Sequence, residues 1–318
     1  MELRALGKTG LATAPVVFGG NVFGWTVDEK TSFDLLDGWL DAGFNAVDTA
    51  DSYSHWAEGN RGGESETIIG KWLKANPSKR DKVLIFTKVG SVQDGKVKGL
   101  SARWIAEGVE RSLKRLQTDR IDLYFAHKPD PNTPFAETLE AFDRLIRAGK
   151  VRAIGASNLD AAQLGDSLRV ARDHNLPRYA VLQPEYNLYD RDGFEGALRE
   201  LTTRESIGVV TYFSLASGFL SGKYATPADI EGTKRNAFLG KYFTPRGARI
   251  LEALGKVAER TGASPAEIAL AWLIGRHGVT APIASATGRD QLASLARAAT
   301  LKLSREDTLT LDTASAAE

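Results

Sequence analysis

Short apolar runs rich in valine and isoleucine alternate along the chain with stretches in which apolar residues recur at helical spacing. Eight such runs occur. They are VVFGG from Val16, NAVDTA from Asn45, KVLIFTKVG from Lys82, IDLYFAH from Ile121, RAIGASN from Arg152, AVLQPEYN from Ala180, GVVTYFSL from Gly208 and TAPIASAT from Thr280. Because their apolar residues are nearly continuous rather than alternating, the runs are typical of parallel strands covered on both faces.

Amphipathic helices are expected between these runs. In residues 28–42 the apolar side chains fall on one face, and Gly43 follows as a stop signal. The same spacing predicts helices over residues 101–116, 135–148 and 161–175. Parallel strands need crossover helices, so eight alternations without a break in composition predict a single-domain α/β protein. We expect a (β/α)8 TIM barrel over residues 1–318, with extra C-terminal helices.

Two segments depart from this rhythm. The opening LRALGKTGLATA, residues 3–14, is typical of a glycine-turned β-hairpin, which we expect to cap the bottom of the barrel. The interval between the seventh and eighth runs is long, and residues 221–247 show little periodicity. Loops of this length in compact domains are usually functional lids or mobile segments.

Composition narrows the class of protein. The 41 Lys and Arg residues nearly balance the 40 Asp and Glu residues, which leaves no basic surface for nucleic acid or anionic lipid. Cysteine is absent, which excludes disulfides, thiolate nucleophiles and cysteine metal sites. The N-terminus has no apolar core of a signal peptide, and no run approaches the roughly 18 apolar residues of a membrane helix. A soluble, cytoplasmic protein is the prediction.

Polar residues recur where the predicted strands end. In a TIM barrel the chemistry lies at the C-terminal ends of the strands, so side chains in this register are expected to converge on one pocket. Read in chain order, they are Asp48, Lys88, His127, Ser157 with Asn158, Gln183, Tyr212 and Ser285.

Acid–base chemistry is the simplest interpretation of Asp48, Lys88 and His127 together with Tyr53. A tyrosine has a reference pKa of about 10, and a lysine ammonium at about 4 Å favours the phenolate by roughly 4 kcal/mol at an effective dielectric near 20. Lys88 can act in this way only if Asp48 keeps it charged when buried. His127 adds an imidazole that can hold a carbonyl oxygen. Such a set suits carbonyl reduction or alcohol oxidation, and a cofactor must then supply the hydride.

These motifs resemble those of a known family. VDTADSY with Asp48 and Tyr53, FTKVG with Lys88, and DLYFAHKPD with His127 are similar to the catalytic tetrad of the aldo-keto reductases, here of a bacterial member. The resemblance spans residues 3–301. It implies hydride transfer from C4 of a nicotinamide to an aldehyde or ketone, with Tyr53 as the proton donor. In the oxidative direction Tyr53 acts as the base. Lys88 and Asp48 tune the acidity of Tyr53, and His127 orients the substrate.

The resemblance also assigns the cofactor positions. Ser157, Asn158 and Gln183 correspond to the residues that bind the nicotinamide carboxamide, and Tyr212 to the aromatic that stacks on the ring. The other cofactor-binding positions that it implies lie in TYFSLASGFLSGK and PIASATGRDQL: Ser214, Leu215, Gly218, Lys223, Ser285, Thr287, Arg289 and Gln291. Arg289 is the candidate for the ribose 2′-phosphate. NADP is therefore the expected cofactor, with NAD or dual use as the alternative, and no metal is implied.

The substrate and some neighbouring residues stay open. We expect a small carbonyl or alcohol, with Trp25, His55 and Trp56 as candidate pocket residues in the loops after the first two strands. Asp51 is predicted to be a structural turn or cap residue. The Lys and Arg residues of 233–249 are expected to be a solvated loop, with folding over the cofactor phosphates as the alternative. The protein is expected to be a monomer or a homo-oligomer.

Two rival functions remain. A metal-dependent barrel hydrolase would need several converging histidines or carboxylates, such as an H-x-H pair on the first strand, and VVFGGN has none. A non-catalytic or weakly catalytic cofactor-binding subunit that senses redox state is the other, because the family resembles channel-associated subunits of that kind.

Overall fold

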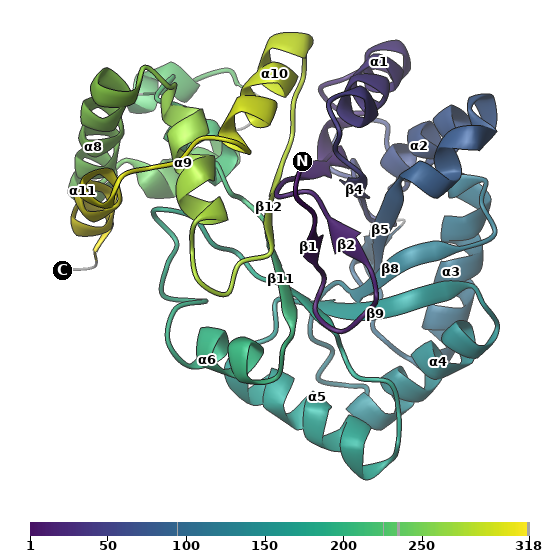
Figure 1. Ribbon diagram of the computed structural model, residues 1–318. Helices are drawn as coiled ribbons and strands as arrows, with labels where there is room; N and C mark the ends of the chain where they lie inside the picture. The colour runs from purple at the N-terminus through teal and green to yellow at the C-terminus, as the bar shows by residue number, and fades with distance from the viewer. Residues whose placement is uncertain (94, 225, 234–235, 317–318) are drawn as a thin grey trace.

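A closed barrel of eight parallel strands forms the centre of the molecule (Figure 1). The computed structural model describes residues 1–93, 95–224, 226–233 and 236–316. Each strand pairs with the next along the barrel, and β12 closes the ring on β3 through Ile283 opposite Val17. The strands are β3 (Val17–Gly19), β4 (Ala46–Asp48), β5 (Leu84–Val89), β8 (Ile121–Ala126), β9 (Val151–Ser157), β10 (Val181–Gln183), β11 (Gly208–Thr211) and β12 (Ala281–Ala284). The predicted (β/α)8 barrel is confirmed.

The predicted helices are also confirmed, and their ends follow capping chemistry. The Asp28 side chain accepts from Thr31 N at 2.8 Å, and Asp160 forms a capping box with Gln163. The fifth helix ends at Asp173, with His174 as its C-cap, slightly earlier than expected. The helices that follow strands in turn are α1 (Glu29–Asp41), α2 (Glu64–Ala75), α3 (Ala102–Leu116), α4 (Phe135–Arg147), α5 (Ala161–Asp173), α6 (Ala197–Arg204), α9 (Pro265–Ile274) and α10 (Arg289–Ala298).

The N-terminal hairpin caps one end of the barrel, as predicted. β1 (Arg4–Ala5) and β2 (Ala12–Thr13) pair antiparallel, and Leu6 and Leu11 pack into the apolar interior of the barrel. Gly7 has a φ of +56°, and a Cβ there would lie 2.4 Å from the carbonyl oxygen of Ala180, so only glycine fits this close approach. The hairpin therefore covers this end of the barrel. A site is expected at the opposite end, where the C-terminal ends of the strands lie.

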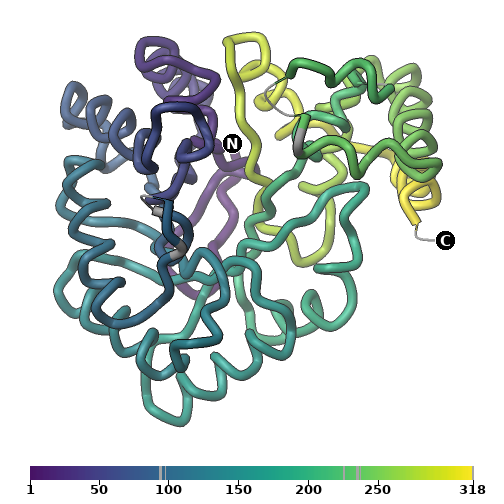
Figure 2. The backbone as a smooth tube through the Cα atoms, turned by 180° about the vertical axis from the view of Figure 1, so that it is seen from behind, coloured from purple at the N-terminus to yellow at the C-terminus, as the bar shows by residue number. Residues whose placement is uncertain are grey.

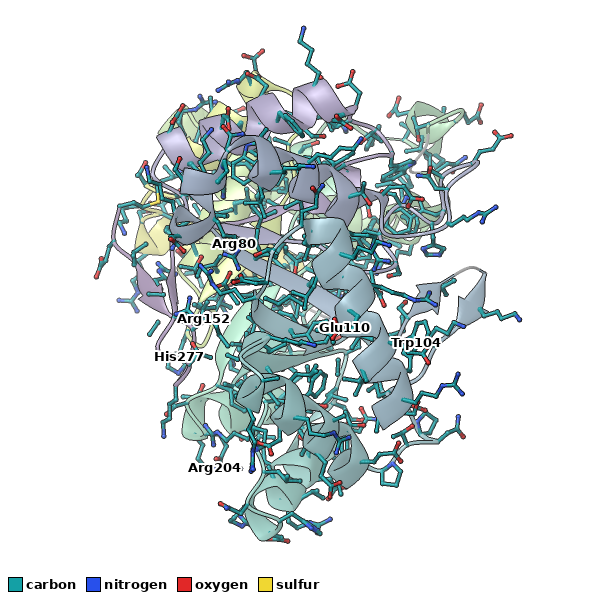
Figure 3. The ribbon with its side chains drawn as sticks, turned by 90° about the vertical axis from the view of Figure 1, so that its right-hand side faces the viewer. Arg80, Trp104, Glu110, Arg152, Arg204 and His277 are labelled. Carbon is teal, nitrogen blue, oxygen red and sulfur yellow. The ribbon has the colours of Figure 1, made fainter. Side chains whose placement is uncertain are left out.

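A buried carboxylate also braces the capped end. Asp122 of β8 is almost fully buried, and its carboxylate accepts from Ile85 N at 2.9 Å. Arg80 and Arg152, labelled in the side view of Figure 3, each lie 2.9 Å from one of its oxygens. The buried Asp122 carboxylate is thus paired with two arginines, as a buried ion requires, and its role is structural.

The loops of the opposite end come to the front in Figure 2. Beyond the strands there, the segment 221–247 is more regular than predicted. It contains η4 (Pro227–Ile230), α7 (Asn236–Leu239) and η5 (Gly240–Tyr242), and α8 (Pro245–Thr261) begins before its end. The Lys241 ammonium lies 2.8 Å from Glu185 and 3.0 Å from Asp190. Lys234 and Arg235 lie outside the described residues.

The expected C-terminal helices are present: α8 packs beside α11 (Arg305–Ser315), as Figure 1 shows. A separate two-stranded hairpin, β6 (Val92–Gln93) with β7 (Lys96–Val97), follows β5. In the part of the chain that the structure describes, no helix has both the length and the apolar character to cross a membrane.

Candidate active site

Lys88 is the centre of the polar cluster at the open end of the barrel. Its side chain is 1% exposed near the end of β5. The ammonium donates to Asp48 Oδ2 at 2.7 Å, to the Thr49 carbonyl oxygen at 2.7 Å and to the Tyr53 hydroxyl oxygen at 2.8 Å. Three acceptors thus meet the three protons of the ammonium, which is the condition for burying that charge.

Asp48 and Tyr53 lie around this ammonium. Asp48 ends β4 and is 1% exposed, and its Oδ2 also accepts from the Tyr53 hydroxyl at 3.1 Å. Its Oδ1 accepts from Gln183 Nε2 at 2.9 Å. The strand direction continues past β4, because Thr49 N donates to Phe86 O at 2.8 Å and Asp51 N to Lys88 O at 3.2 Å. This backbone pairing brings the turn that carries Tyr53 back beside Lys88.

His127 completes the predicted tetrad. It directly follows β8, and its backbone N donates to Val89 O at 2.8 Å. Its ring lies 6.1 Å from the Tyr53 ring, centre to centre, and its Nδ1 is 3.5 Å from the Ser52 hydroxyl. Tyr53 and His127 both keep a partly exposed surface, whereas Asp48 and Lys88 do not. The structure therefore brings all four residues together, with the two outer ones facing the opening.

The environment of the cluster sets its protonation. Desolvation raises the pKa of Tyr53 well above its ordinary value, and the adjacent Asp48 adds to this effect. The net direction is therefore upward in the protein alone, although the Lys88 ammonium that donates to the hydroxyl oxygen by itself favours the phenolate. Desolvation lowers the pKa of Lys88 against the opposing pull of Asp48. Desolvation and the nearby Lys88 lower the pKa of His127 well below its ordinary value. At neutral pH, Tyr53 thus holds its proton and His127 is neutral.

A second group of predicted residues adjoins the tetrad. Ser157 Oγ donates to Gln183 O at 2.7 Å, and Asn158 Nδ2 donates to His127 O at 2.9 Å. The Tyr212 hydroxyl donates to Asn158 Oδ1 at 2.7 Å. Asn158 has a φ of +63°, an unusual conformation that this network holds in place. Strand ends β9, β10 and β11 therefore present hydroxyl, amide and aromatic groups side by side.

The loop after β11 has an unusual backbone. Phe213, Ala216, Ser217 and Gly218 all have positive φ values, between +48° and +102°. Left-handed conformations in non-glycine residues cluster at functional sites, because they cost free energy that the surrounding structure must offset. Leu215 lies within this loop. The Ser214 hydroxyl is turned back onto Thr211 O at 3.1 Å.

The side chains of the predicted residues after β12 already have partners. The Ser285 hydroxyl is 2.7 Å from Gly19 O and 2.6 Å from Asn21 Oδ1. Thr287 N donates to Gln291 Oε1 at 2.8 Å. Arg289, the first residue of α10, donates from Nε to Asp34 Oδ2 of α1 at 2.6 Å and also from Nη2 to Asp34 Oδ1.

These residues fit a nicotinamide dinucleotide. Hydroxyl and amide groups suited to a carboxamide adjoin the tetrad at Ser157, Asn158 and Gln183, and Tyr212 offers a ring. Further along the face, the left-handed loop lies after β11, and α10 begins after β12 at Arg289, with Gly288 as an N-cap that offers no side-chain hydrogen bond. Phosphate sites in TIM barrels lie at the loops after the last two strands and at the start of an extra helix. Lys223 is exposed, with its ammonium 4.7 Å from the Tyr224 ring centre.

The three residues predicted for the pocket lie together, and one of them packs beside Tyr53. Trp25 and Trp56 pack edge to face at 5.6 Å, and Trp56 lies 6.0 Å from Tyr53 and 5.2 Å from His55. Beside them is a cleft of about 460 Å³, lined by His55, Asn60, Arg61 and Gly95. Within the ranges that the structure describes, no three histidine or carboxylate side chains gather as metal ligands would.

Several neighbours of the site could not be found from the sequence. Ser52 beside His127 and Asp34 beside Arg289 belong to ordinary polar stretches. Asp51 occupies a turn, as predicted, but is 1% exposed rather than solvated. Desolvation and the nearby Glu66 raise the pKa of Asp51 well above its ordinary value. Glu66 itself accepts from Thr87 and Arg115, both at 2.6 Å. The charges of Asp51 and Glu66 also act on Lys88, where they oppose the lowering of its pKa by desolvation.

Known proteins share this sequence pattern. The model of the aldo/keto reductase family matches residues 15–316. The chain is 35% identical to "Uncharacterized oxidoreductase YrpG" of Bacillus subtilis, over 96% of this chain and 93% of that protein. It is also 35% identical to "Aldo-keto reductase YhdN" of the same organism, over 98% and 93%. A "Probable voltage-gated potassium channel subunit beta" of Oryza sativa is 34% identical, over 92% and 89%. The chain is an oxidoreductase-type barrel protein that belongs to the aldo/keto reductase family.

Proposed function

We propose that this protein interconverts an aldehyde or ketone and the corresponding alcohol with NADP(H), and that Tyr53 is the proton donor and acceptor. The observation that carries the proposal is the contact of one buried ammonium, Lys88, with both the Tyr53 hydroxyl at 2.8 Å and Asp48 at 2.7 Å. A phenol held in this way at the mouth of a barrel is a positioned acid that needs neither a metal nor a covalent intermediate.

In reduction, each residue of the tetrad has one task. A nicotinamide held by Ser157, Asn158, Gln183 and Tyr212 would supply the hydride. Tyr53, protonated at neutral pH, gives its proton to the carbonyl oxygen as charge develops there. His127, as the neutral imidazole, donates a hydrogen bond that orients the same oxygen. Lys88 stabilises the phenolate that remains, because its ammonium already touches the hydroxyl oxygen. Asp48 keeps Lys88 in place.

Oxidation of an alcohol needs Tyr53 to begin as a phenolate, and desolvation with the adjacent Asp48 disfavours that state in the protein without nucleotide. At neutral pH Tyr53 therefore starts in the protonated form that carbonyl reduction needs. Trp56 packs beside Tyr53, and Trp25 and His55 pack against Trp56, which suits a small carbonyl compound that places an apolar or ring portion against the two indoles.

NADP is the proposed cofactor, with NAD as the alternative. Ser157, Asn158 and Gln183 would hold the carboxamide, and Tyr212 would lie against the ring. The loop with Ser214, Leu215, Gly218 and Lys223 would follow the pyrophosphate. Ser285, Thr287, Arg289 and Gln291 would hold the adenosine end, with Arg289 as the only one of these four that carries a positive charge.

The alternative is a cofactor-binding redox sensor with little or no turnover. It is supported by the similarity to a probable and a putative voltage-gated potassium channel subunit beta, from Oryza sativa and Schizosaccharomyces pombe, each 34% identical to this chain. The presence of all four tetrad residues favours catalysis, because a sensor that only binds nucleotide has no need of a proton donor.

A spectrophotometric screen distinguishes the two. Purified protein is mixed with NADPH or NADH and a panel of aliphatic, aromatic and sugar aldehydes and ketones, and absorbance at 340 nm is followed. The reverse direction uses the alcohols with NADP⁺ or NAD⁺. The proposal predicts oxidation of NADPH by at least one class of carbonyl. Tight nucleotide binding without turnover of any member of the panel would favour the sensor.

A further inference from the structure

The arginine best placed for a nucleotide phosphate is already bound to a carboxylate. Arg289 at the start of α10 and Asp34 in α1 form a two-point contact, with Nε and Nη2 each facing one carboxylate oxygen. The two residues are 255 positions apart in the chain, and α1 and α10 lie side by side (Figure 1). This fork geometry is the one that guanidinium also uses for phosphate.

The surface of α1 is shaped to receive this guanidinium. Gly38 lies one turn after Asp34, and a Cβ there would come 2.2 Å from Arg289 Nη1, so the glycine leaves the space that the guanidinium fills. Asp37 and Asp41 of the same helix add negative charge around Arg289. Asp37 has other partners, since it accepts from Trp72 Nε1 and from Lys79 Nζ, both at 2.6 Å. Asp34 is thus the acid that meets Arg289 directly.

We propose that Asp34 is a specificity-determining residue, which withholds Arg289 from the 2′-phosphate and so weakens the preference for NADP(H) over NAD(H). The inference rests on the proposed function, in which the adenosine end of the nucleotide lies at α10. A 2′-phosphate must take Arg289 from Asp34, and it must also approach the charge of Asp34. NAD(H) has no phosphate at that position, so its binding leaves the contact undisturbed.

Because of this competition, the 2′-phosphate adds to the binding free energy only the difference between its own contact with Arg289 and the contact of Arg289 with Asp34. The pair is about half exposed, with side chains 54% and 51% accessible, so water and salt weaken it and it can exchange. The wild-type protein is therefore expected to use both nucleotides, with an NADP(H) preference smaller than Arg289 alone would give.

The opposite role for Asp34 has a different signature. If Asp34 instead held Arg289 in the position that binds phosphate, its loss would weaken NADP(H) binding. The sign of the change in affinity therefore separates a competing residue from an orienting one, without any measurement of turnover.

The test is calorimetric titration of wild type, Asp34→Asn, Arg289→Ala and the double variant with NADP⁺ and with NAD⁺. Asp34→Asn is expected to bind NADP⁺ about 3- to 10-fold more tightly, since an exposed ion pair and one nearby repulsion are removed. Its affinity for NAD⁺ should stay within about twofold. In the Arg289→Ala background, the Asp34→Asn gain for NADP⁺ should shrink, because the contested arginine is absent.

Asp41→Asn is the matched control, because it removes the same charge from the same helix without removing a contact to Arg289. Its NADP⁺ affinity should rise less than that of Asp34→Asn. An Asp34→Asn gain below about twofold, a loss of NADP⁺ affinity, or an equal gain in Asp41→Asn overturns the proposal. Absence of binding of both nucleotides to the wild type would instead refute the proposed function itself, so the two failures are distinguishable.

Discussion

Two ion pairs at the open end of the barrel show how burial decides what a charged contact can do. Lys88 and Asp48 are each 1% exposed, whereas Arg289 and Asp34 are each about half exposed. The buried pair is fixed from several sides, by Thr49, Tyr53 and Gln183. The exposed pair joins two helices across the surface, and its partners can be exchanged. The first arrangement suits a rigid proton donor, and the second suits a tunable contact with a ligand.

The two ion pairs should differ most in how much their loss lowers the free energy of unfolding. Lys88→Met leaves Asp48 buried without its counter-ion, and breaking a buried pair costs roughly 3–5 kcal/mol of the free energy of unfolding. Arg289→Met removes one side of an exposed pair, and no measurable loss is expected. Urea unfolding of both variants, followed by circular dichroism, measures the difference. Equal stability of the two variants would contradict the distinction drawn between the pairs.

A second buried acid offers a subtler contrast. Burial raises the pKa of Asp51 well above its ordinary value, so the folded protein holds a proton that the unfolded chain releases above about pH 4. The stabilisation that comes from the protonated Asp51 is fully present below that pH, and it is lost as the pH rises through the pKa of Asp51 in the folded protein. Asp51→Asn should therefore match wild type near pH 4 and become more stable than wild type as pH rises.

Unfolding free energies at pH 4, 6 and 8 provide the measurement. Asp41→Asn is the control, because it removes an acid from the exposed end of α1. It should show no gain that grows with pH. If Asp51→Asn lost stability relative to wild type at pH 8, Asp51 would be a charged partner of Lys88 and Arg115 instead of a protonated acid.

The smallest effect is expected in the pH profile of reduction. The pKa of Tyr53 is raised and that of His127 is lowered, so both keep one protonation state through the neutral range. The value of kcat/KM for carbonyl reduction should be nearly constant between about pH 6.5 and 9. Initial rates at 340 nm across that range check this. A fall centred near neutral pH would show that one of these buried groups titrates there.

Much of the fold could be predicted because the barrel repeats one signal eight times. Continuous apolar runs marked the eight strands of the barrel, and the capping residues Asp28 and Ser101 marked helix starts. The hairpin of β6 and β7 was not predicted. Segment 221–247 was predicted less well. Its short helices have too few turns to show a period, and contacts such as Lys241 with Glu185 order it through tertiary structure.

Some residues of the candidate site could be predicted from the sequence and others could not. Asp48, Lys88 and His127 were predictable because each lies at or next to the C-terminal end of a strand, and these ends must converge. Asp34 gave no signal, since an aspartate on the exposed face of an amphipathic helix is ordinary and its partner lies 255 residues away. The direction of the Tyr53 pKa shift was also out of reach, because desolvation depends on packing that a sequence does not display.

The central claim is that the Tyr53 hydroxyl, held by Lys88, supplies the proton for carbonyl reduction. Single-turnover oxidation of bound NADPH by a carbonyl substrate, followed by stopped flow at 340 nm, tests it in wild type and Tyr53→Phe. Loss of a positioned general acid predicts a rate about 10²- to 10⁴-fold lower in Tyr53→Phe. The Kd for NADPH should stay within about threefold, because the substitution removes the hydroxyl group and leaves the ring. A Tyr53→Phe rate within about tenfold of wild type would contradict the account.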